Sequence, residues 1–182
     1  DNGNSIDYLG QQGVGGTPFP LVRNVYTTAD DEIVVVCTTN TGSLAYWFSS
    51  AGALMYKVPI DTKTVPSLPD ASSFQSLYPS IENVIPDYTE RKLFVKVDYY
   101  ASSVDKESKV QSGIDYVRTL LYPLDIEKGT YERSIFVPPY EESLTADYSK
   151  IVYKLPYDYL GTTRSGWQFF IVSTTTGFNI QM

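Results

Sequence analysis

Carboxylate side chains are the residues of this sequence whose type and spacing come closest to a chemical site. They stand at Asp30-Asp31-Glu32, Asp98, Asp105, Glu107, Glu141-Glu142 and Asp158. Paired acids can bind calcium or share the acid and base roles of glycoside hydrolysis, but both uses require two carboxylates at a defined separation. The spacing here defines no such pair. We therefore expect Asp30-Asp31 to accept backbone hydrogen bonds in a turn, and Glu141-Glu142 to lie in a solvated loop.

Histidine is absent from the sequence, and cysteine occurs once, at Cys37. A Ser-His-Asp site cannot be assembled from this chain, and a zinc site is not expected without histidine ligands. We therefore predict no catalytic residues, no metal site and no cofactor. Cys37 lies inside an apolar run over residues 33–37, where a lone cysteine is most simply a small core residue.

The glycine-rich stretch GQQGVGG (residues 10–16) could cradle a phosphate with its backbone N–H groups. A phosphate loop of this kind is followed at once by a helix, whereas this one runs into Thr17-Pro18-Phe19-Pro20. Glycine also serves wherever the backbone needs a positive φ. We therefore interpret the stretch as a linker between two structural units.

Composition favours an all-β protein. The chain has 182 residues, of which 42% are hydrophobic and 14% aromatic, and the aromatic residues stand in short runs with Val and Ile. These residue types suit the pleated, half-buried surface of a sheet. The net charge is −7, and no basic cluster is longer than Arg91-Lys92. Neither nucleic acid nor an anionic membrane surface is therefore an expected partner.

Short β-type runs separated by turn residues fall into repeating units. The first unit has strands at 19–26, 32–38, 44–49 and 54–60, and four antiparallel strands in about 42 residues are typical of one β-propeller blade. The second unit has strands at 80–85, 92–100, 116–125 and 131–137. A third begins at 151–155 or 159–160, continues at 167–173 and ends inside its third strand at 178–182. A helical turn is possible only near residues 72–77.

The predicted fold is therefore all-β, a partial β-propeller of about three four-stranded blades that is cut mid-blade at both ends. Gly3, Gly52 and Gly129 occupy equivalent turns, where a positive φ is needed. The alternative is a β-sandwich with irregular strands. A longer parent protein is expected. The predicted divisions are 1–16 (the end of a preceding blade and a linker), 17–66 (a blade), 78–140 (a blade with an insertion at 101–113) and 148–182 (an incomplete blade).

Several motifs resemble a known family. The segment WFSSAGALMY (47–56) resembles NHL-type propeller repeats. Further segments are similar to a group of uncharacterised spirochaete lipoproteins with NHL-like propellers: IDYLGQQG (6–13), GGTPFP (15–20), KLFVKVDYY (92–100), YER (131–133) and VPP (137–139). The resemblance implies an extracytoplasmic, periplasmic or membrane-anchored location through a lipid attached upstream of this chain. It implies no activity and no catalytic residues, and Cys37, in mid-strand, is not the lipid-bearing cysteine.

Candidate contact residues lie on the connections and on one strand. Most aromatic side chains are expected in the core between blades, whereas the long connections at 61–77 and 101–113 are expected to reach partners. Lys106, Glu107 and Lys109 make the second connection a charged, exposed tip. Along residues 93–100, alternation places Lys96 and Asp98 together on the more polar face, as a polar pair at the surface or lining a tunnel.

The function expected from these features is a non-catalytic β-propeller scaffold that mediates protein–protein interaction in an extracytoplasmic assembly. Its partner is another protein or the remaining blades of the same parent chain. The alternative is a propeller hydrolase or carbohydrate-binding protein whose active residues lie in blades absent from this chain. Histidines and clustered acids at the tunnel mouth of the parent would favour the alternative, because fold alone does not decide function.

Overall fold

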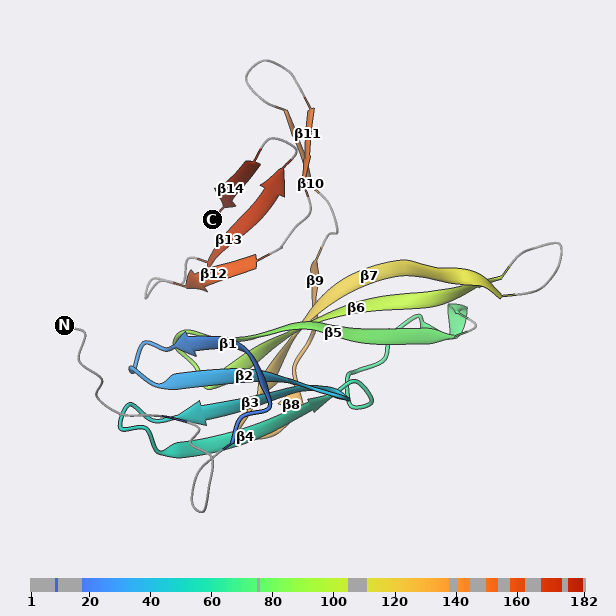
Figure 1. Ribbon diagram of the computed structural model, residues 1–182. Coiled ribbons are helices and arrows are strands. Elements are labelled where there is room, and N and C mark those ends of the chain that lie inside the picture. The colour runs from blue at the N-terminus through green and yellow to red at the C-terminus, as the bar shows by residue number, and fades with distance from the viewer. Residues whose placement is uncertain are drawn as a thin grey trace.

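The chain folds into antiparallel sheets with almost no helix (Figure 1). The structure is a computed structural model, and it describes residues 9, 18–74, 76–104, 111–137, 141–144, 150–153, 158–162, 168–174 and 177–181. Within these ranges the helical content is one short 3-10 turn, η1 (Ala71–Ser73). The all-β class predicted from composition is therefore confirmed.

The first sheet is a meander of four strands paired in sequence order. Each strand lies within two residues of its predicted bounds. Two turn residues adopt positive φ, Asp31 at 57° and Gly52 at 80°, so the turn predicted at Asp30-Asp31 is confirmed. The strands are β1 (Leu21–Thr27), β2 (Ile33–Thr39), β3 (Gly42–Phe48) and β4 (Leu54–Asp61).

The second sheet repeats this order with three longer strands and a short fourth. Its members are β5 (Leu77–Pro86), β6 (Lys92–Val104), β7 (Gln111–Asp125) and β8 (Thr130–Tyr131), and β9 (Ile135–Val137) pairs separately with β7. The strand predicted at 131–137 is thus divided between β8 and β9. The connection predicted over 101–113 is shorter than expected, because the β6–β7 ladder continues beyond the core through Ala101↔Asp115 and Ser103↔Gly113.

The remaining strands form a hairpin and a three-stranded sheet. The prediction of a solvated loop at Glu141-Glu142 is wrong, because both residues lie in β10 and pair with β11. Backbone pairing does not require an apolar sequence, and so the acidic composition concealed this strand. The hairpin is β10 (Glu141–Leu144) with β11 (Lys150–Tyr153), and the sheet is β12 (Asp158–Thr162), β13 (Gln168–Thr174) and β14 (Gly177–Gln181).

The main core lies where the first and second sheets meet face to face; we call this interface the seam, and the faces that form it the inner faces. The first sheet contributes buried residues such as Val34 and Trp47, and the second contributes the alternating set predicted on β6: Leu93, Val95, Val97 and Tyr99. Side chains that alternate along a strand share one face, so this set lies together as expected. Val65 and Leu68 are also buried here, so the connection at 61–77 packs into the core in part instead of lying wholly exposed.

The outer face of the first sheet, opposite the seam, is apolar as well. Val35, Cys37, Tyr46 and Phe48 are all buried there, and Leu9 and Phe19 pack against them. Because Cys37 is fully buried in this cluster, its interpretation as a core residue is confirmed, and burial raises the pKa of its thiol. The first sheet therefore buries apolar side chains on both of its faces.

Candidate functional site

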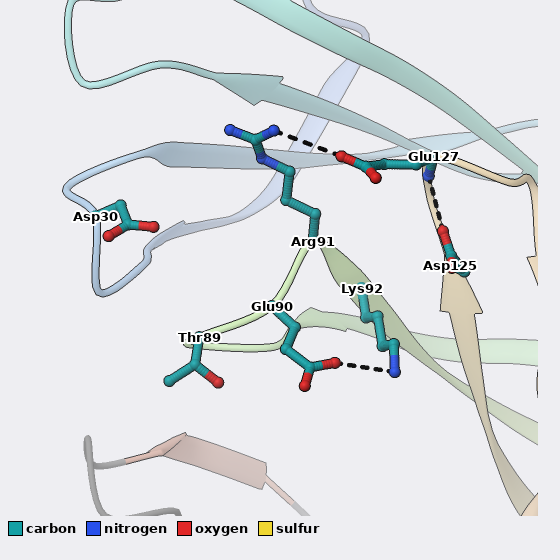
Figure 2. A pocket seen from close by; sticks show the side chains of 7 residues that line it. All are labelled: Asp30, Thr89, Glu90, Arg91, Lys92, Asp125 and Glu127. Atoms are coloured by element: carbon teal, nitrogen blue, oxygen red, sulfur yellow. Dashed lines mark hydrogen bonds and ion pairs between the residues drawn. The ribbon is translucent and has the colours of Figure 1, made fainter.

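A pocket of about 400 Å³ opens at one end of the seam, where turns of both sheets meet (Figure 2). It lies between the β1–β2, β5–β6 and β7–β8 turns, which are far apart in the sequence. The packing of the two sheets therefore creates it. The lining residues are Asp30, Thr89, Glu90, Arg91, Lys92, Asp125 and Glu127.

Two aspartates shape the turns that border this pocket. Asp87 Oδ1 accepts hydrogen bonds from the backbone N–H groups of Thr89 at 2.8 Å and Glu90 at 3.0 Å. Asp125 Oδ1 accepts from the N–H groups of Glu127 and Lys128, both at 3.0 Å. Aspartate closes turns in this way because its short side chain reaches backbone donors two and three residues later. Each turn thus holds its charged side chains at the pocket mouth.

Arg91 connects the two sheets. Its Nη2 lies 2.9 Å from Glu32 Oε1, which precedes β2, and its Nη1 lies 3.5 Å from Glu127 Oε1. The guanidinium also lies over the ring of Tyr56 on β4, 5.8 Å from the ring centre. A planar guanidinium suits such combined pairing and stacking. Arg91 therefore holds residues of the first sheet against the turns of the second.

Glu32 is the buried member of this network, with 7% of its surface exposed. Its second oxygen, Oε2, accepts a hydrogen bond from Trp47 Nε1 at 2.6 Å. A buried carboxylate is costly unless its oxygens are paired, and here one oxygen faces a guanidinium and the other an indole N–H. Glu32 therefore contacts both a core side chain, Trp47, and a side chain that lines the pocket, Arg91.

Three ionisable groups around the pocket, Arg91, Lys92 and Asp125, are stabilised in their charged forms. The hydrogen bond to Glu32 is the main reason that the pKa of Arg91 is raised, and hydrogen bonds to Glu90 and then Glu132 raise the pKa of Lys92. The Lys128 ammonium lowers the pKa of Asp125. A general acid or base works best with a pKa near the operating pH, and none of these shifts moves a group toward neutrality. The pocket is arranged for ion pairing.

Metal ligands are not gathered in the part of the chain that the structure describes, where no group of three His, Cys, Asp or Glu residues could hold an ion. Four of the pocket's lining residues are acidic and two are basic, and the basic pair, Arg91 and Lys92, is engaged with carboxylates. Such a pocket can keep the two sheets in register and can accept a small polar group.

A second pocket, of about 420 Å³, lies along β4 and the β7–β8 turn. Tyr56 stands between the two pockets and donates a hydrogen bond to Glu127 Oε1 at 3.2 Å. Apolar side chains such as Val58, Leu124 and Ile126 make up much of the lining of the second pocket. This pocket therefore offers space without an obvious reactive group.

Of the residues predicted as contact sites, the structure describes two, Lys96 and Asp98. Lys106, Glu107 and Lys109 lie outside the described residues. Asp98 is buried, with 5% of its surface exposed, and its Oδ1 accepts a hydrogen bond of 2.6 Å from Thr119. Lys96 is half-buried two residues away on the same strand. The role proposed for the Lys96/Asp98 pair stays a prediction.

The prediction that most aromatic side chains lie in the core is confirmed for the run at residues 46–48. Tyr46, Trp47 and Phe48 are each less than 4% exposed, so all three rings are core. The side chains of the run at 167–170 lie outside the described set, as does the glycine-rich stretch at 10–16. Gly52 and Gly129 have the positive φ expected of their turns, at 80° and 67°, while Gly3 falls among the residues that are not described.

Sequence reasoning missed the network of Glu32, Trp47 and Arg91. Glu32 stands beside Asp30-Asp31 and looks like part of a solvated turn, and Arg91 is 59 residues further along the chain. One signal was available: Glu32 directly precedes an apolar strand, where an acid must either face water or find a buried partner.

Comparisons with known proteins do not assign the chain. No family model, curated protein or solved structure matches it. In the described ranges, no helix has the length and apolar character needed to cross a membrane.

Proposed function

We propose that this chain is a non-catalytic β-propeller module that binds a protein partner in an extracytoplasmic assembly. The observation that carries the proposal is the exposed aromatic surface of the long β6–β7 hairpin and its neighbour β5. Tyr78 is 44% exposed, Tyr116 37% and Ile114 58%. Aromatic side chains are enriched in protein interfaces, and clustered exposed apolar groups on a soluble domain commonly mark binding surfaces.

The hairpin reaches beyond the part of the second sheet that the first sheet covers (Figure 1). β6 has 13 residues and β7 has 15, against 7 residues in each of β2 and β3. Only part of the hairpin packs on the first sheet at the seam. The remaining portion and the adjacent part of β5, which we call the hairpin platform, keep regular strand pairing. Sites on regular strands hold contact residues in place better than sites on loops.

The propeller part of the proposal is supported by the order and burial of the sheets. Two consecutive four-stranded meanders pack face to face, as adjacent blades do. In a simple two-sheet sandwich the outer faces would meet solvent. The outer face of the first sheet instead buries Val35, Cys37, Tyr46 and Phe48. A sheet that needs cover on both faces behaves as an inner blade of a series.

The extracytoplasmic location in this proposal rests on the resemblance to spirochaete lipoproteins with NHL-like propellers. An experimental structure of the protein would test the blade arrangement directly: sheets placed radially around an axis support it, and an isolated face-to-face pair overturns it.

The binding role is best tested by photo-crosslinking in the native cell. A photoreactive phenylalanine analogue replaces Tyr78 on the hairpin platform in one variant and Leu54 in another. Leu54 is a matched control because it is 43% exposed but lies on the first sheet. We expect a discrete protein adduct from position 78 and not from position 54. Equal adducts from both positions, or none from position 78, would overturn the proposal.

A further inference from the structure

Three tyrosines form one row across the outer face of the second sheet. Backbone register pairs Tyr78 with Tyr100 and Tyr100 with Tyr116, so the three lie side by side on β5, β6 and β7. The rings of Tyr100 and Tyr116 are 6.0 Å apart and inclined by 76°. They form two walls of a corner, with Tyr78 as the exposed third member. We call these three residues the tyrosine row.

The next row of the same face carries a buried carboxylate. Ser80, Asp98 and Thr119 are paired across the same three strands. Asp98 is 5% exposed and accepts a hydrogen bond from Thr119. Glu82 stands beside this row and accepts a hydrogen bond of 2.7 Å from Ser80. Desolvation is the main reason that the pKa of Tyr100 is raised, and the charges of Asp98 and Glu82 raise it further. Both carboxylates are therefore close enough to influence the tyrosine row.

The direction of the hydrogen bonds shows which ligand groups this face can receive. The Thr119 hydroxyl donates a hydrogen bond to Asp98 Oδ1 at 2.6 Å. The Tyr116 hydroxyl lies 2.9 Å from the Thr119 hydroxyl. Because the Thr119 proton is used toward Asp98, the Tyr116 hydroxyl donates to Thr119. The carboxylates of Asp98 and Glu82 each accept a hydrogen bond from a hydroxyl group, so the charged groups beside the tyrosine row are acceptors and suit a donor.

Charge and ring geometry together favour a cation. Among the residues that the structure describes around the tyrosine row, this face carries two carboxylates, those of Glu82 and Asp98, and one ammonium group, that of Lys96, so their charges sum to −1. The face of an aromatic ring attracts a cation held near it. Two perpendicular rings can contact a compact group from two sides, whereas a flat sugar ring needs an aromatic ring parallel to it. An anionic ligand would be repelled by both carboxylates.

We propose that the tyrosine row, with Asp98 and Glu82, binds the ammonium group of a lysine side chain on a protein partner. This inference rests on the proposed function, since it names the chemistry of the partner that the hairpin platform holds. Lysine supplies a compact charge with three donors and no acceptor, which matches a corner of rings lined with acceptors.

The test uses the 182-residue chain and a blocked tetralysine peptide, with binding followed by NMR titration. Its matched peptide is tetralysine acetylated at each ammonium group, which keeps the length and removes the charge. We expect the charged peptide to bind and the acetylated one to bind at least about tenfold more weakly. Binding should also weaken as salt is raised, because exposed charge pairs are screened.

Variants then locate the site. Tyr78→Ala and Glu82→Gln should each weaken tetralysine binding by about five- to tenfold. Asp31→Asn is the control for Glu82→Gln, because it removes one negative charge from an exposed turn of the first sheet and should leave binding nearly unchanged. Equal loss in Glu82→Gln and Asp31→Asn would show attraction to the overall acidity and would overturn the proposal, as would equal binding of the acetylated peptide or no binding at all.

The same variants separate this inference from the proposed function. If the unchanged chain does not bind tetralysine, while the cellular crosslink from a neighbouring hairpin position such as Ile114 forms in the unchanged chain and in Tyr78→Ala and Glu82→Gln, then the partner exists and the lysine site is wrong. If no cellular adduct forms from the hairpin in any variant, the proposed function itself fails.

Discussion

The first and second sheets share a strand order and a common seam, but their outer faces differ in character. The outer face of the first sheet buries Val35, Cys37 and Phe48. The outer face of the second carries Asp98, Tyr100 and Thr119 at the corresponding alternate positions of its central strands. Since both sheets are antiparallel meanders, the difference comes from the residues at every second position. The apolar residues of the first outer face are buried by packing, whereas on the second outer face Asp98 and Thr119 are buried in a hydrogen bond to each other and Tyr100 beside them is half-buried.

The two sheets also differ in length beyond the seam. β7 is 8 residues longer than β3, since it has 15 residues against 7. At about 3.4 Å per residue this adds roughly 27 Å of strand. The connection between β4 and β5 covers the inner face of this extension, where Tyr99 donates a hydrogen bond to Pro66 O and Arg118 pairs with Asp70 at 2.8 Å. The extension is therefore ordered on one face by the chain itself, and its other face carries the tyrosine row.

The largest effect is expected where the two sheets meet. Trp47 is 1% exposed and donates the hydrogen bond that satisfies Glu32 Oε2. Trp47→Ala should lower the free energy of unfolding by about 3–5 kcal/mol, because it leaves a large cavity and removes a donor from a buried carboxylate. Urea unfolding followed by circular dichroism measures the change.

Trp47→Phe separates the two parts of that loss. It keeps most of the ring and removes the indole N–H, so we expect a loss of about 1–3 kcal/mol from the unpaired Glu32 oxygen and a smaller cavity. If Trp47→Phe were as stable as the unchanged chain, the hydrogen bond to Glu32 would contribute nothing to the seam.

A pair of glycines tests how tightly each sheet constrains its turns. A Cβ added at Gly42, at the start of β3, would lie 2.1 Å from the backbone oxygen of Ile60, and its φ is 153°. The same atom added at Gly129, in the second sheet, would meet nothing within 4 Å, and only its φ of 67° opposes the change. Gly42→Ala should cost about 3 kcal/mol or more, and Gly129→Ala about 1 kcal/mol.

Thermal unfolding of these two variants, measured side by side, checks the order. The clash at Gly42 involves backbone on a neighbouring strand and cannot be relieved by turning a side chain. Equal losses of thermal stability would mean that β3 and β4 can move apart at little cost. The first sheet would then be no more constrained at its turns than the second.

The sequence carried enough information for the strands of both sheets because alternation and turn residues are local signals. Apolar residues occupy every second position at residues 93–99, and the Ser-Ser-Ala-Gly composition before Leu54 predicts the turn at Gly52. Sequence patterns predict strands less well where strand pairing continues beyond the apolar core. Ser102 and Ser103 look like loop residues, yet they extend β6, because cross-strand hydrogen bonds depend on the partner strand and not on apolar side chains.

The candidate sites were predicted less well because they depend on residues brought together over long distances. Alternation placed Lys96 and Asp98 together on the more polar face of β6, but the burial of Asp98 and its hydrogen bond to Thr119 depend on the neighbouring strand. Likewise, Glu32 and Arg91 are separated by 59 residues, and no local pattern joins them. The polarity of the β6 face was therefore predictable, whereas its partners on β5 and β7 were not.

The outer face of the first sheet can be tested through Cys37. Cys37→Ser places a hydroxyl of similar size in an apolar cluster and should cost about 1–3 kcal/mol, whereas Cys37→Ala loses only a small volume and should cost about 1 kcal/mol. Chemical denaturation of the two variants measures the difference. If serine is tolerated as well as alanine, water reaches this face, and the contrast between the two outer faces disappears.

The smallest effect is expected at the turn of the second sheet that borders the pocket, and it depends on pH. Lys128 lowers the pKa of Asp125 in the folded chain, so the ionised carboxylate contributes stability above its unfolded pKa, and this contribution is lost as pH falls through the lowered folded value. Asp125→Asn should therefore make stability fall less steeply between about pH 4 and pH 2. Asp61→Asn at the end of β4 is the matched control. Asp61 also accepts a backbone hydrogen bond in a turn, from Lys63 N–H at 2.8 Å. Unlike Asp125, it has no ion-pair partner among the contacts described. Melting temperatures measured across this range should converge for Asp125→Asn and the unchanged chain at low pH and separate above it. An unchanged acid slope in Asp125→Asn would show that the Lys128 pair contributes nothing to the turn, and that the charged end of the seam is held by Arg91 and Glu32.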